Sequence, residues 1–163
     1  MANYEKNVRV RIVSDKYDNT DILAAQVANI PTDASEQPKA HEDHFEFVTA
    51  DGKLISLDGT ITLLYNDNEV FDGENTKTSI SFSEKEPNVL TLIRDGNVST
   101  AMVFEEGKRH ISVYNTPFMP FELCISTLKV RNRLLSYGYI ELDYIIEIHG
   151  VQTERTIMKI SVF

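Results

Sequence analysis

Residues 89–119 read VLTLIRDGNVSTAMVFEEGKRHISVYNTPFM. Three short runs of branched and aromatic residues are separated by Asp95-Gly96 and Glu106-Gly107, and the third run ends at Thr116-Pro117. An Asp-Gly pair between two such runs is typical of a tight hairpin, because it supplies the positive φ angles that match the twist of the strands. The stretch therefore predicts a β-meander and an all-β fold, but it indicates no chemistry.

The chain has 163 residues, of which 42% are hydrophobic. A domain of that size buries about 70% of the surface of its unfolded chain, so its core needs no disulfide or structural metal. We expect a single domain over residues 1–163, with a buried, inert thiol at the single cysteine, Cys124. Because no apolar run approaches the roughly 20 residues that span a bilayer, and no signal peptide is recognised, we expect a cytoplasmic protein with no membrane partner.

The formal net charge is −9 and the isoelectric point is about 4.9. Nucleic-acid binding depends on clustered Lys and Arg, so we expect no nucleic-acid partner. Lys129, Arg131 and Arg133 alternate along a predicted strand. We interpret them as its solvated face.

The N-terminal part contains one strand followed by a long acidic connection. Residues 8–13 alternate apolar and basic side chains, which predicts Val8, Val10 and Ile12 on the core side. Residues 14–42 form the connection. Within it, residues 22–30 fit either two helical turns capped by Thr20 or a short strand, and a lid over one mouth of a barrel is the functional interpretation.

Further strands are predicted at residues 44–55, 60–65, 76–82, 121–130, 139–149 and 156–162. Asp51-Gly52 in mid-strand predicts a bulge, Asp58-Gly59 a hairpin turn, and residues 84–88 a turn before the meander. In residues 139–149, alternate apolar side chains share a face that we expect to be buried, namely Ile140, Leu142, Tyr144, Ile146 and Ile148. The opposite face carries Glu141 and Asp143, which we interpret as solvated.

About eight to ten strands joined mostly by short turns favour a single antiparallel up-and-down barrel over a Greek-key sandwich. The connections are local, and a barrel closes its own edges. A barrel of this size is either filled by side chains or holds one small ligand.

Several spaced motifs resemble the YwiB-like family of uncharacterised bacterial proteins. They cover roughly residues 45–163 and comprise Gly73–Thr78, Leu90–Gly96, Val103-Phe104 with Gly107, Tyr114–Phe118 and Gly138–Tyr144. The resemblance implies a calycin-like barrel, similar in architecture to lipocalins and fatty-acid-binding proteins. It implies no activity, cofactor or catalytic residue.

This chain departs from the family pattern at two places. Met119 and Pro120 follow the Thr-Pro-aromatic triplet where the family usually has Gly, and the connection over residues 18–40 is longer than usual. The chain also has no Trp and so lacks the lipocalin Gly-x-Trp signature. Any lipocalin-type function is therefore analogy with the fold alone.

No recognisable catalytic or metal-binding motif occurs. His41 and His44 flank two carboxylates, but strand alternation places the two imidazoles on opposite faces, so we predict a solvated acidic turn and no metal site. His110 and His149 are predicted surface residues. Nucleophile elbows, Walker loops and dinucleotide fingerprints are also missing, so we expect no catalytic residue, no cofactor and no enzymatic activity.

Four residues are candidates for ligand binding: Arg94, Tyr65, Tyr114 and Tyr144. Tyr144 belongs to an inward face, where a tyrosine hydroxyl usually finds a partner. Arg94 would need a carboxylate, carbonyls or a ligand anion if it pointed inward. A two-residue Asp95-Gly96 turn instead groups Ile93 with the inward residues of the next strand, so the pattern favours an exposed Arg94.

Two functional hypotheses follow. The first is a non-catalytic barrel that binds a small, partly apolar molecule, with Arg94 and the tyrosines at its polar end. The second is a protein-interaction or regulatory module whose barrel is filled by side chains and holds no ligand.

Overall fold

The computed structural model describes residues 3–18, 44–66, 76–96 and 99–163. These residues form ten strands and one helical turn. In chain order the elements are β1 (Tyr4–Asp18), β2 (His44–Leu57), β3 (Thr60–Asn66), β4 (Lys77–Ser83), β5 (Glu86–Asp95), β6 (Ser99–Glu105), β7 (Arg109–Asn115), β8 (Pro120–Arg133), α2 (Leu134–Tyr137), β9 (Tyr139–Ile148) and β10 (Val151–Val162). Within these ranges no helix is long and apolar enough to cross a lipid bilayer.

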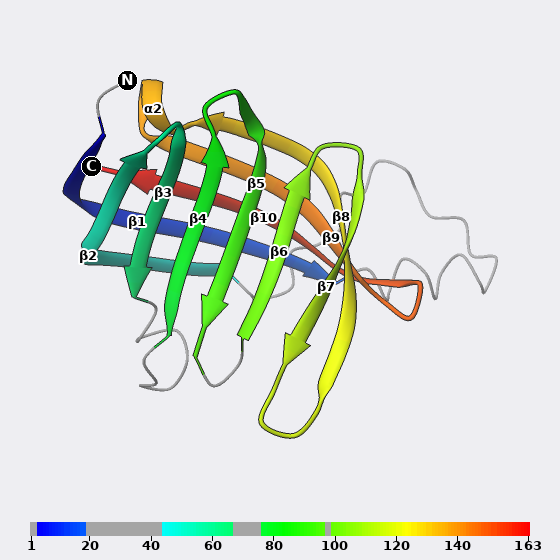
Figure 1. Cartoon of the computed structure of the whole chain (residues 1–163). Coiled ribbons are helices and arrows are strands. Elements are labelled where there is room, and N and C mark those ends of the chain that lie inside the picture. Colours follow the sequence, from blue (N-terminus) through cyan, green and yellow to red (C-terminus); the bar gives the residue numbers. More distant parts are fainter. Residues whose placement is uncertain (1–2, 19–43, 67–75, 97–98) are drawn as a thin grey trace.

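The ten strands close into one antiparallel barrel (Figure 1). Each strand pairs with its neighbours in sequence, and β1 closes the ring by pairing with both β2 and β10. The connectivity is therefore up-and-down, as predicted, and not Greek-key. In Figure 1, strands β3 to β6 run across β1, β9 and β10, so the barrel has two walls that face each other.

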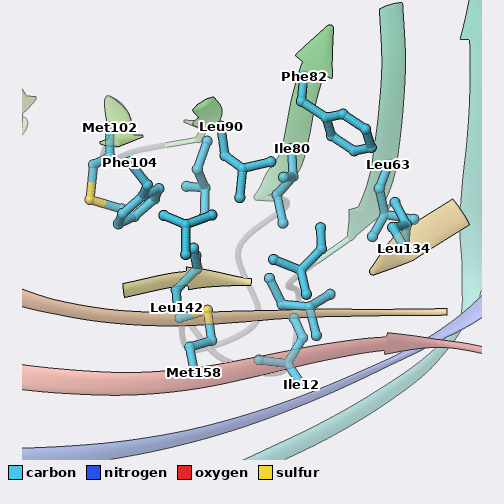
Figure 2. Packing of buried hydrophobic residues seen from close by; sticks show 14 of the residues in the cluster. Ile12, Leu63, Ile80, Phe82, Leu90, Met102, Phe104, Leu134, Leu142 and Met158 are labelled. Carbon is cyan, nitrogen blue, oxygen red and sulfur yellow. The ribbon is translucent and has the colours of Figure 1, made fainter. Parts of the chain in front are cut away.

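The core forms where the inward side chains of the two walls meet. Burial alternates along each strand with the period of two expected for a sheet with one buried side. Figure 2 shows side chains from β3 to β6, such as Leu90 and Phe104, pointing toward Leu142 and Met158 of the other wall. Side chains therefore fill the apolar part of the interior.

Two glycine-containing features shape the ring. At the Asp58-Gly59 turn both residues have positive φ, 50° and 83°, as a two-residue hairpin requires. Opposite Val8 and Val10, β2 carries one extra residue, which confirms the bulge predicted at Asp51-Gly52. A Cβ on Gly52 would lie 2.6 Å from Val10 Cγ2, so a glycine is needed here for close approach.

Three predictions about the strands and turns need correction. Strand β1 continues to Asp18, because residues 14–18 pair with β10, so the acidic connection does not begin at Ser14. The turn predicted over residues 84–88 is only Glu84-Lys85. No helix was predicted for Leu134–Tyr137, which form the helical turn α2 with Gly138 at its C-terminal cap. The helix or strand proposed for residues 22–30 lies outside the described residues.

The third correction concerns the meander. Ile93 pairs with Ala101 and Arg94 with Thr100, a register that a two-residue Asp95-Gly96 turn cannot produce. Gly96 has no positive φ, and a Cβ there would lie 2.6 Å from Thr76 Oγ1. Gly96 therefore permits a close approach to Thr76, the residue before β4, and does not form the predicted tight turn.

Core packing can be tested with two leucines on neighbouring strands. Leu142 is 1% exposed and Leu128 is 45% exposed. We expect Leu142→Ala to lower the free energy of unfolding by about 2–5 kcal/mol, because it removes buried methyl groups and leaves a cavity. Leu128→Ala should cost much less. Urea unfolding followed by circular dichroism measures both, and equal losses would contradict the described core.

Candidate functional site

A row of polar side chains crosses the inner surface of five consecutive strands. Cross-strand pairing links Tyr65 to Thr78, Thr78 to Arg94, Arg94 to Thr100, and Thr100 to Tyr114. Every member lies next to its neighbour because the register is continuous from β3 to β7. The row lies toward the end of the barrel where β3, β5 and β7 finish, opposite α2.

A second polar row lies on the facing wall. Thr127 pairs with Tyr144, and Tyr144 pairs with Thr156. All three are buried, and Tyr144 is 5% exposed. Thr156 Oγ1 donates a hydrogen bond to Glu154 Oε1 at 3.3 Å. We call the two rows together the polar layer.

The two rows are electrostatically coupled. Burial raises the pKa of Tyr144 to about 12, because the phenolate would lose its hydration. The positive charge of Arg94 and a hydrogen bond with Thr156 oppose this rise, while Glu154 and Tyr114 add to it. Arg94, Tyr114 and Tyr144 therefore interact across the polar end of the interior.

The placement of Arg94 corrects the prediction that it is exposed. Its strand neighbours Leu90 and Leu92 face inward, and Arg94 continues their alternation. Ile93, which was predicted to face inward, is 44% exposed. The cause is the register of β5 and β6: Ile93 lies opposite Ala101 on the outer face, and Arg94 lies opposite the buried Thr100.

Hydroxyl groups are concentrated in and beside the polar layer. The Ser112 hydroxyl donates to Ala101 O at 2.6 Å and lies 3.0 Å from Thr100 Oγ1. Ser14 Oγ and Thr127 Oγ1 are buried and have no hydrogen-bond partner among the described residues. A buried polar group without a partner costs free energy, so these two hydroxyls are suited to meet a further polar molecule.

A surface hollow of about 510 Å³ lies along the β5–β7 wall, and its lining includes Arg94 and Thr100 of the polar layer. The registered pairs of the β6–β7 ladder are Ser99–Asn115 and Thr100–Tyr114, so the ladder is short here. The apolar lining comes from Ile93, Ala101, Ile111 and Val113, and the polar lining from Arg94, Asp95, Ser99, Thr100 and Asn115. The hollow thus joins an apolar outer surface to two members of the polar layer.

The structure brings together three of the four residues proposed from the sequence, Arg94, Tyr114 and Tyr144. Tyr65 lies at the far end of the same row and is buried. Sequence reasoning missed four threonines of the polar layer as site residues, namely Thr78, Thr100, Thr127 and Thr156. Their signal was a threonine at an inward strand position, but only the cross-strand register shows that these positions meet.

Other candidates lie outside the polar layer. His44 Nδ1 lies 2.5 Å from Asp15 Oδ1 on the exposed surface, and this hydrogen bond raises the pKa of His44. His41 lies outside the described residues. His149 is exposed, but His110 is half-buried, so its prediction as a surface residue was wrong. The described ranges contain no group of three or more potential metal ligands.

Cys124 lies on the outer side of β8 and is partly exposed, so the prediction of a buried thiol was wrong. It pairs with Ile111 and Glu147, and Glu147 forms an ion pair with Arg109. Burial and a hydrogen bond to Glu147 raise the pKa of the Cys124 thiol. The thiol is therefore protonated at neutral pH and is a weak nucleophile.

The charged outer face of β8 to β10 contains cross-strand ion pairs. Arg131 Nη1 lies 3.7 Å from Glu141 Oε2, and Arg155 Nη2 lies 2.7 Å from Asp143 Oδ2. Lys129, Arg131 and Arg133 are all exposed, as predicted. This face is a ladder of opposite charges.

The fold and the site define a class: closed, ten-stranded up-and-down barrels whose interior is apolar in its centre and polar at one end. Residues 30–160 match the family model of DUF1934, a domain of unknown function, so the chain belongs to the DUF1934 family. Among curated proteins none matches the sequence.

The chain is similar to the ywiB protein from Bacillus subtilis, whose crystal structure is known. The TM-score is 0.69 at 19% sequence identity, over 96% of this chain and 92% of that one. The match confirms the predicted resemblance and the barrel architecture. At this identity, it concerns the fold alone.

The burial of Tyr144 leads to a titration test. Because its pKa in the folded protein is about 12, above the ordinary value of 10.0, folding favours the neutral phenol. That contribution to stability is complete below pH 10 and is lost as the pH rises through about 12. We expect Tyr144→Phe to remove the tyrosine ionisation near pH 12, measured by phenolate absorbance.

Tyr137→Phe is the matched control, since Tyr137 is exposed. This variant should keep the high-pH ionisation step. If Tyr144→Phe leaves that step unchanged, Tyr144 is not the buried phenol described here.

Proposed function

We propose that this protein is a non-catalytic binding protein for a small, partly apolar molecule. The polar end of that molecule lies in the polar layer, and its apolar part lies in the hollow of the β5–β7 wall. The observation that carries the proposal is the position of Arg94, which belongs to the polar layer and also lines the hollow of about 510 Å³. This volume falls in the range of roughly 300–1,000 Å³ that is typical of small-molecule sites.

The lining of the hollow suits a molecule of mixed polarity. Ile93, Ile111 and Val113 offer apolar contact, and Arg94 and Thr100 are among the polar residues of the lining. A guanidinium binds carboxylates and other planar acceptors in a fixed geometry, so the polar end of the ligand should accept hydrogen bonds. Small-molecule sites commonly combine apolar walls with a few polar groups of this kind.

The site lies at the edge of the packed core, not deep within it. Side chains fill the apolar part of the interior, so the hollow is an open site and not an enclosed lipocalin-type cavity (Figure 2). Arg94, Tyr114 and Tyr144 keep the role predicted for them, at the polar end of the ligand. Tyr65, which is separated from Arg94 by Thr78, supports the row from its far end.

Binding without catalysis fits the protonation states of the nearby groups. The raised pKa of Tyr144 keeps its phenol neutral below pH 10, where it donates a hydrogen bond but does not act as a base. The raised pKa of Cys124 makes its thiol a poor nucleophile, and Cys124 lies outside the hollow. The groups of the polar layer can therefore hold a polar end group without reacting with it.

Native mass spectrometry of protein purified from the cells that naturally produce it tests this proposal. We expect a retained small molecule that denaturation releases. Arg94→Met should weaken its retention at least about tenfold, because a hydrogen bond to a charged group is worth roughly 1.5–3 kcal/mol. The measurement is the fraction of protein that carries the added mass.

Arg131→Met is the control, because Arg131 is an exposed arginine in an ion pair on the outer face. It should retain the molecule like the wild type, and both variants should keep the wild-type circular dichroism spectrum. A wild-type protein with no added mass, or an Arg94→Met variant with undiminished retention, would refute the proposal.

A further inference from the structure

The far half of the β7–β8 hairpin is bound to the rest of the sheet along one side. In β8, pairing with β9 begins at Cys124. The four residues before it, 120–123, pair with β7 alone in the described sheet. The other side of this half of the hairpin faces β6. We call residues 112–123 the flap, because in the described sheet they pair with the rest of the barrel only through β6.

The ladder between β6 and the flap is short. Its registered pairs are Ser99–Asn115 and Thr100–Tyr114, although β6 and β7 each have seven residues. On its other side, β6 pairs with β5 from Thr100 to Glu105. Within the described ring, the β6–β7 seam is therefore the one that the fewest registered pairs cross.

A side-chain hydroxyl strengthens this short seam. Ser112 Oγ of the flap donates a hydrogen bond to Ala101 O of β6 at 2.6 Å and lies 3.0 Å from Thr100 Oγ1. Ser112 and Thr100 are both buried, so water does not compete for these contacts in the closed barrel. We call them the serine clasp. The clasp can open by rotation of one side chain, without disruption of any other ladder.

The flap covers part of the polar layer but does not belong to the main core. Leu123 points inward from the flap and is buried, yet it is not a member of the core cluster. Tyr114 faces inward beside it and is only half-buried, whereas Thr100 opposite is buried. An outward movement of the flap would therefore uncover the β7 end of the polar layer and leave the core intact.

The base of the hairpin is held more firmly than the flap. Arg109 Nε donates a hydrogen bond to Glu147 Oε2 at 3.0 Å, which joins β7 to β9 across β8. The β6–β7 turn is also bound to β8, since the Gly107 N–H group donates to Thr127 O at 2.9 Å. The base therefore stays in place when the flap moves.

The flap itself is a stiff unit. Tyr114 and Phe121 stack across its two strands with ring centroids 5.5 Å apart. At its end, Thr116 Oγ1 accepts hydrogen bonds from the backbone N–H groups of Phe118 and Met119. Figure 1 shows the hairpin extending beyond the ends of β4, β5 and β6, so this end lies clear of those strands. The flap can therefore move without losing its own structure.

We propose that the flap is a gate through which a small molecule enters the polar layer. The serine clasp and the two registered pairs open together, and the flap turns away from β6 about the pair Ile111–Cys124 at its base. The hollow is lined by Ala101 of β6 and Val113 of the flap, so it spans the seam that opens. Local opening occurs where few backbone hydrogen bonds hold an element.

The identity of what enters rests on the proposed function, but the opening is a property of the barrel. Thiol labelling measures it without any added ligand. In a Cys124→Ser background, Thr127→Cys places a reporter thiol in the polar layer. Val10→Cys places one in the core at the α2 end of the barrel. The native side chains are 2% and 0% exposed, and both replacements change the side-chain volume little.

We expect methyl methanethiosulfonate to label the thiol at position 127 at least about tenfold faster than the thiol at position 10, because labelling follows the population of the open form. Mass spectrometry measures both rates. Labelling at position 127 should change little at low urea concentrations, because opening of the flap exposes little surface. Labelling at position 10 should rise steeply with urea, because it needs global unfolding.

Ser112→Ala tests the clasp. It should speed labelling at position 127 by about fivefold or more, because it removes a hydrogen bond that exists only in the closed barrel. Thr153→Ala is the matched control, since Thr153 Oγ1 also donates to a carbonyl of the next strand, Ile146 O, at 3.0 Å. That bond remains when the flap opens, so the control should leave labelling at position 127 unchanged. Circular dichroism should show every variant folded.

Two results would overturn the gate. One is a thiol at position 127 that is labelled no faster than the thiol at position 10 and with the same urea dependence. The other is a folded Ser112→Ala variant that is labelled no faster than Thr153→Ala. If Ser112→Ala does not fold, the comparison of the two reporter positions decides alone. Either failure leaves the bound molecule to be detected by native mass spectrometry, so failure of the gate and failure of the proposed function are distinguishable.

Discussion

The whole barrel depends on the pairing of β1 with two partners at once. Every other pairing in the ring joins strands that are adjacent in sequence, whereas β1 and β10 are the first and the last strands of the chain. The registered pairs run from Val10–Val162 to Asp18–Glu154, and reciprocal backbone hydrogen bonds of 3.0 Å join Arg9 and Phe163 at the end of this seam. Without it, the sheet would have two long edges open to aggregation. The bulge at Gly52 supports the pairing of β1 with its other neighbour, β2. At this position β2 packs closely against Val10, and only a residue without a side chain fits.

Closure also determines where chemistry can occur. In a closed sheet every second side chain points inward. Alternation therefore determines which residues form the inner surface, and the identity of those residues determines whether it is apolar or polar. Along β5 these positions read Leu90, Leu92 and Arg94, and along β9 they read Ile140, Leu142 and Tyr144. Both strands change from apolar to polar toward the same end of the barrel. The polar layer follows from two sequence patterns that only the ring brings face to face.

The fold was predictable because a sheet with one buried side leaves a strong signal. Alternation located most strands, and Asp-Gly pairs correctly indicated the turn at Asp58-Gly59 and the bulge at Gly52. Alternation failed where polar residues occupy strand positions, as at Ser14–Asp18, which pair with β10 and, at Ser14 and Asp15, also with β2. Local patterns also overestimated the turn after Ser83, where Glu84 and Lys85 suffice.

The candidate site was only partly predictable, because it depends on register. The dipeptide Asp95-Gly96 indicates a tight hairpin. In the structure, Gly96 instead lets the chain pass close to Thr76, a contact between distant residues that no local sequence pattern reveals. The register of β5 and β6 therefore differs from the one that a tight Asp95-Gly96 turn predicts, and it places Arg94 on the inner face of the barrel. Similarly, the run around Cys124 predicts a strand, but which of its side chains face outward depends on the partners across the sheet.

The polar layer is best understood by asking what stability alone would favour. A buried hydroxyl with no partner costs about 1–3 kcal/mol, and Ser14 Oγ and Thr127 Oγ1 both have none among the described residues. Valine has nearly the shape of threonine and would remove this cost at position 127. Tyr144 adds a buried phenol, and the cost of burying its phenolate form raises its pKa to about 12, so the phenol stays neutral at physiological pH. Stability alone therefore does not account for the two hydroxyls that have no partner among the described residues. Proteins accept such costs mainly at functional sites, and here the groups concerned lie in and beside the layer that shares Arg94 and Thr100 with the hollow.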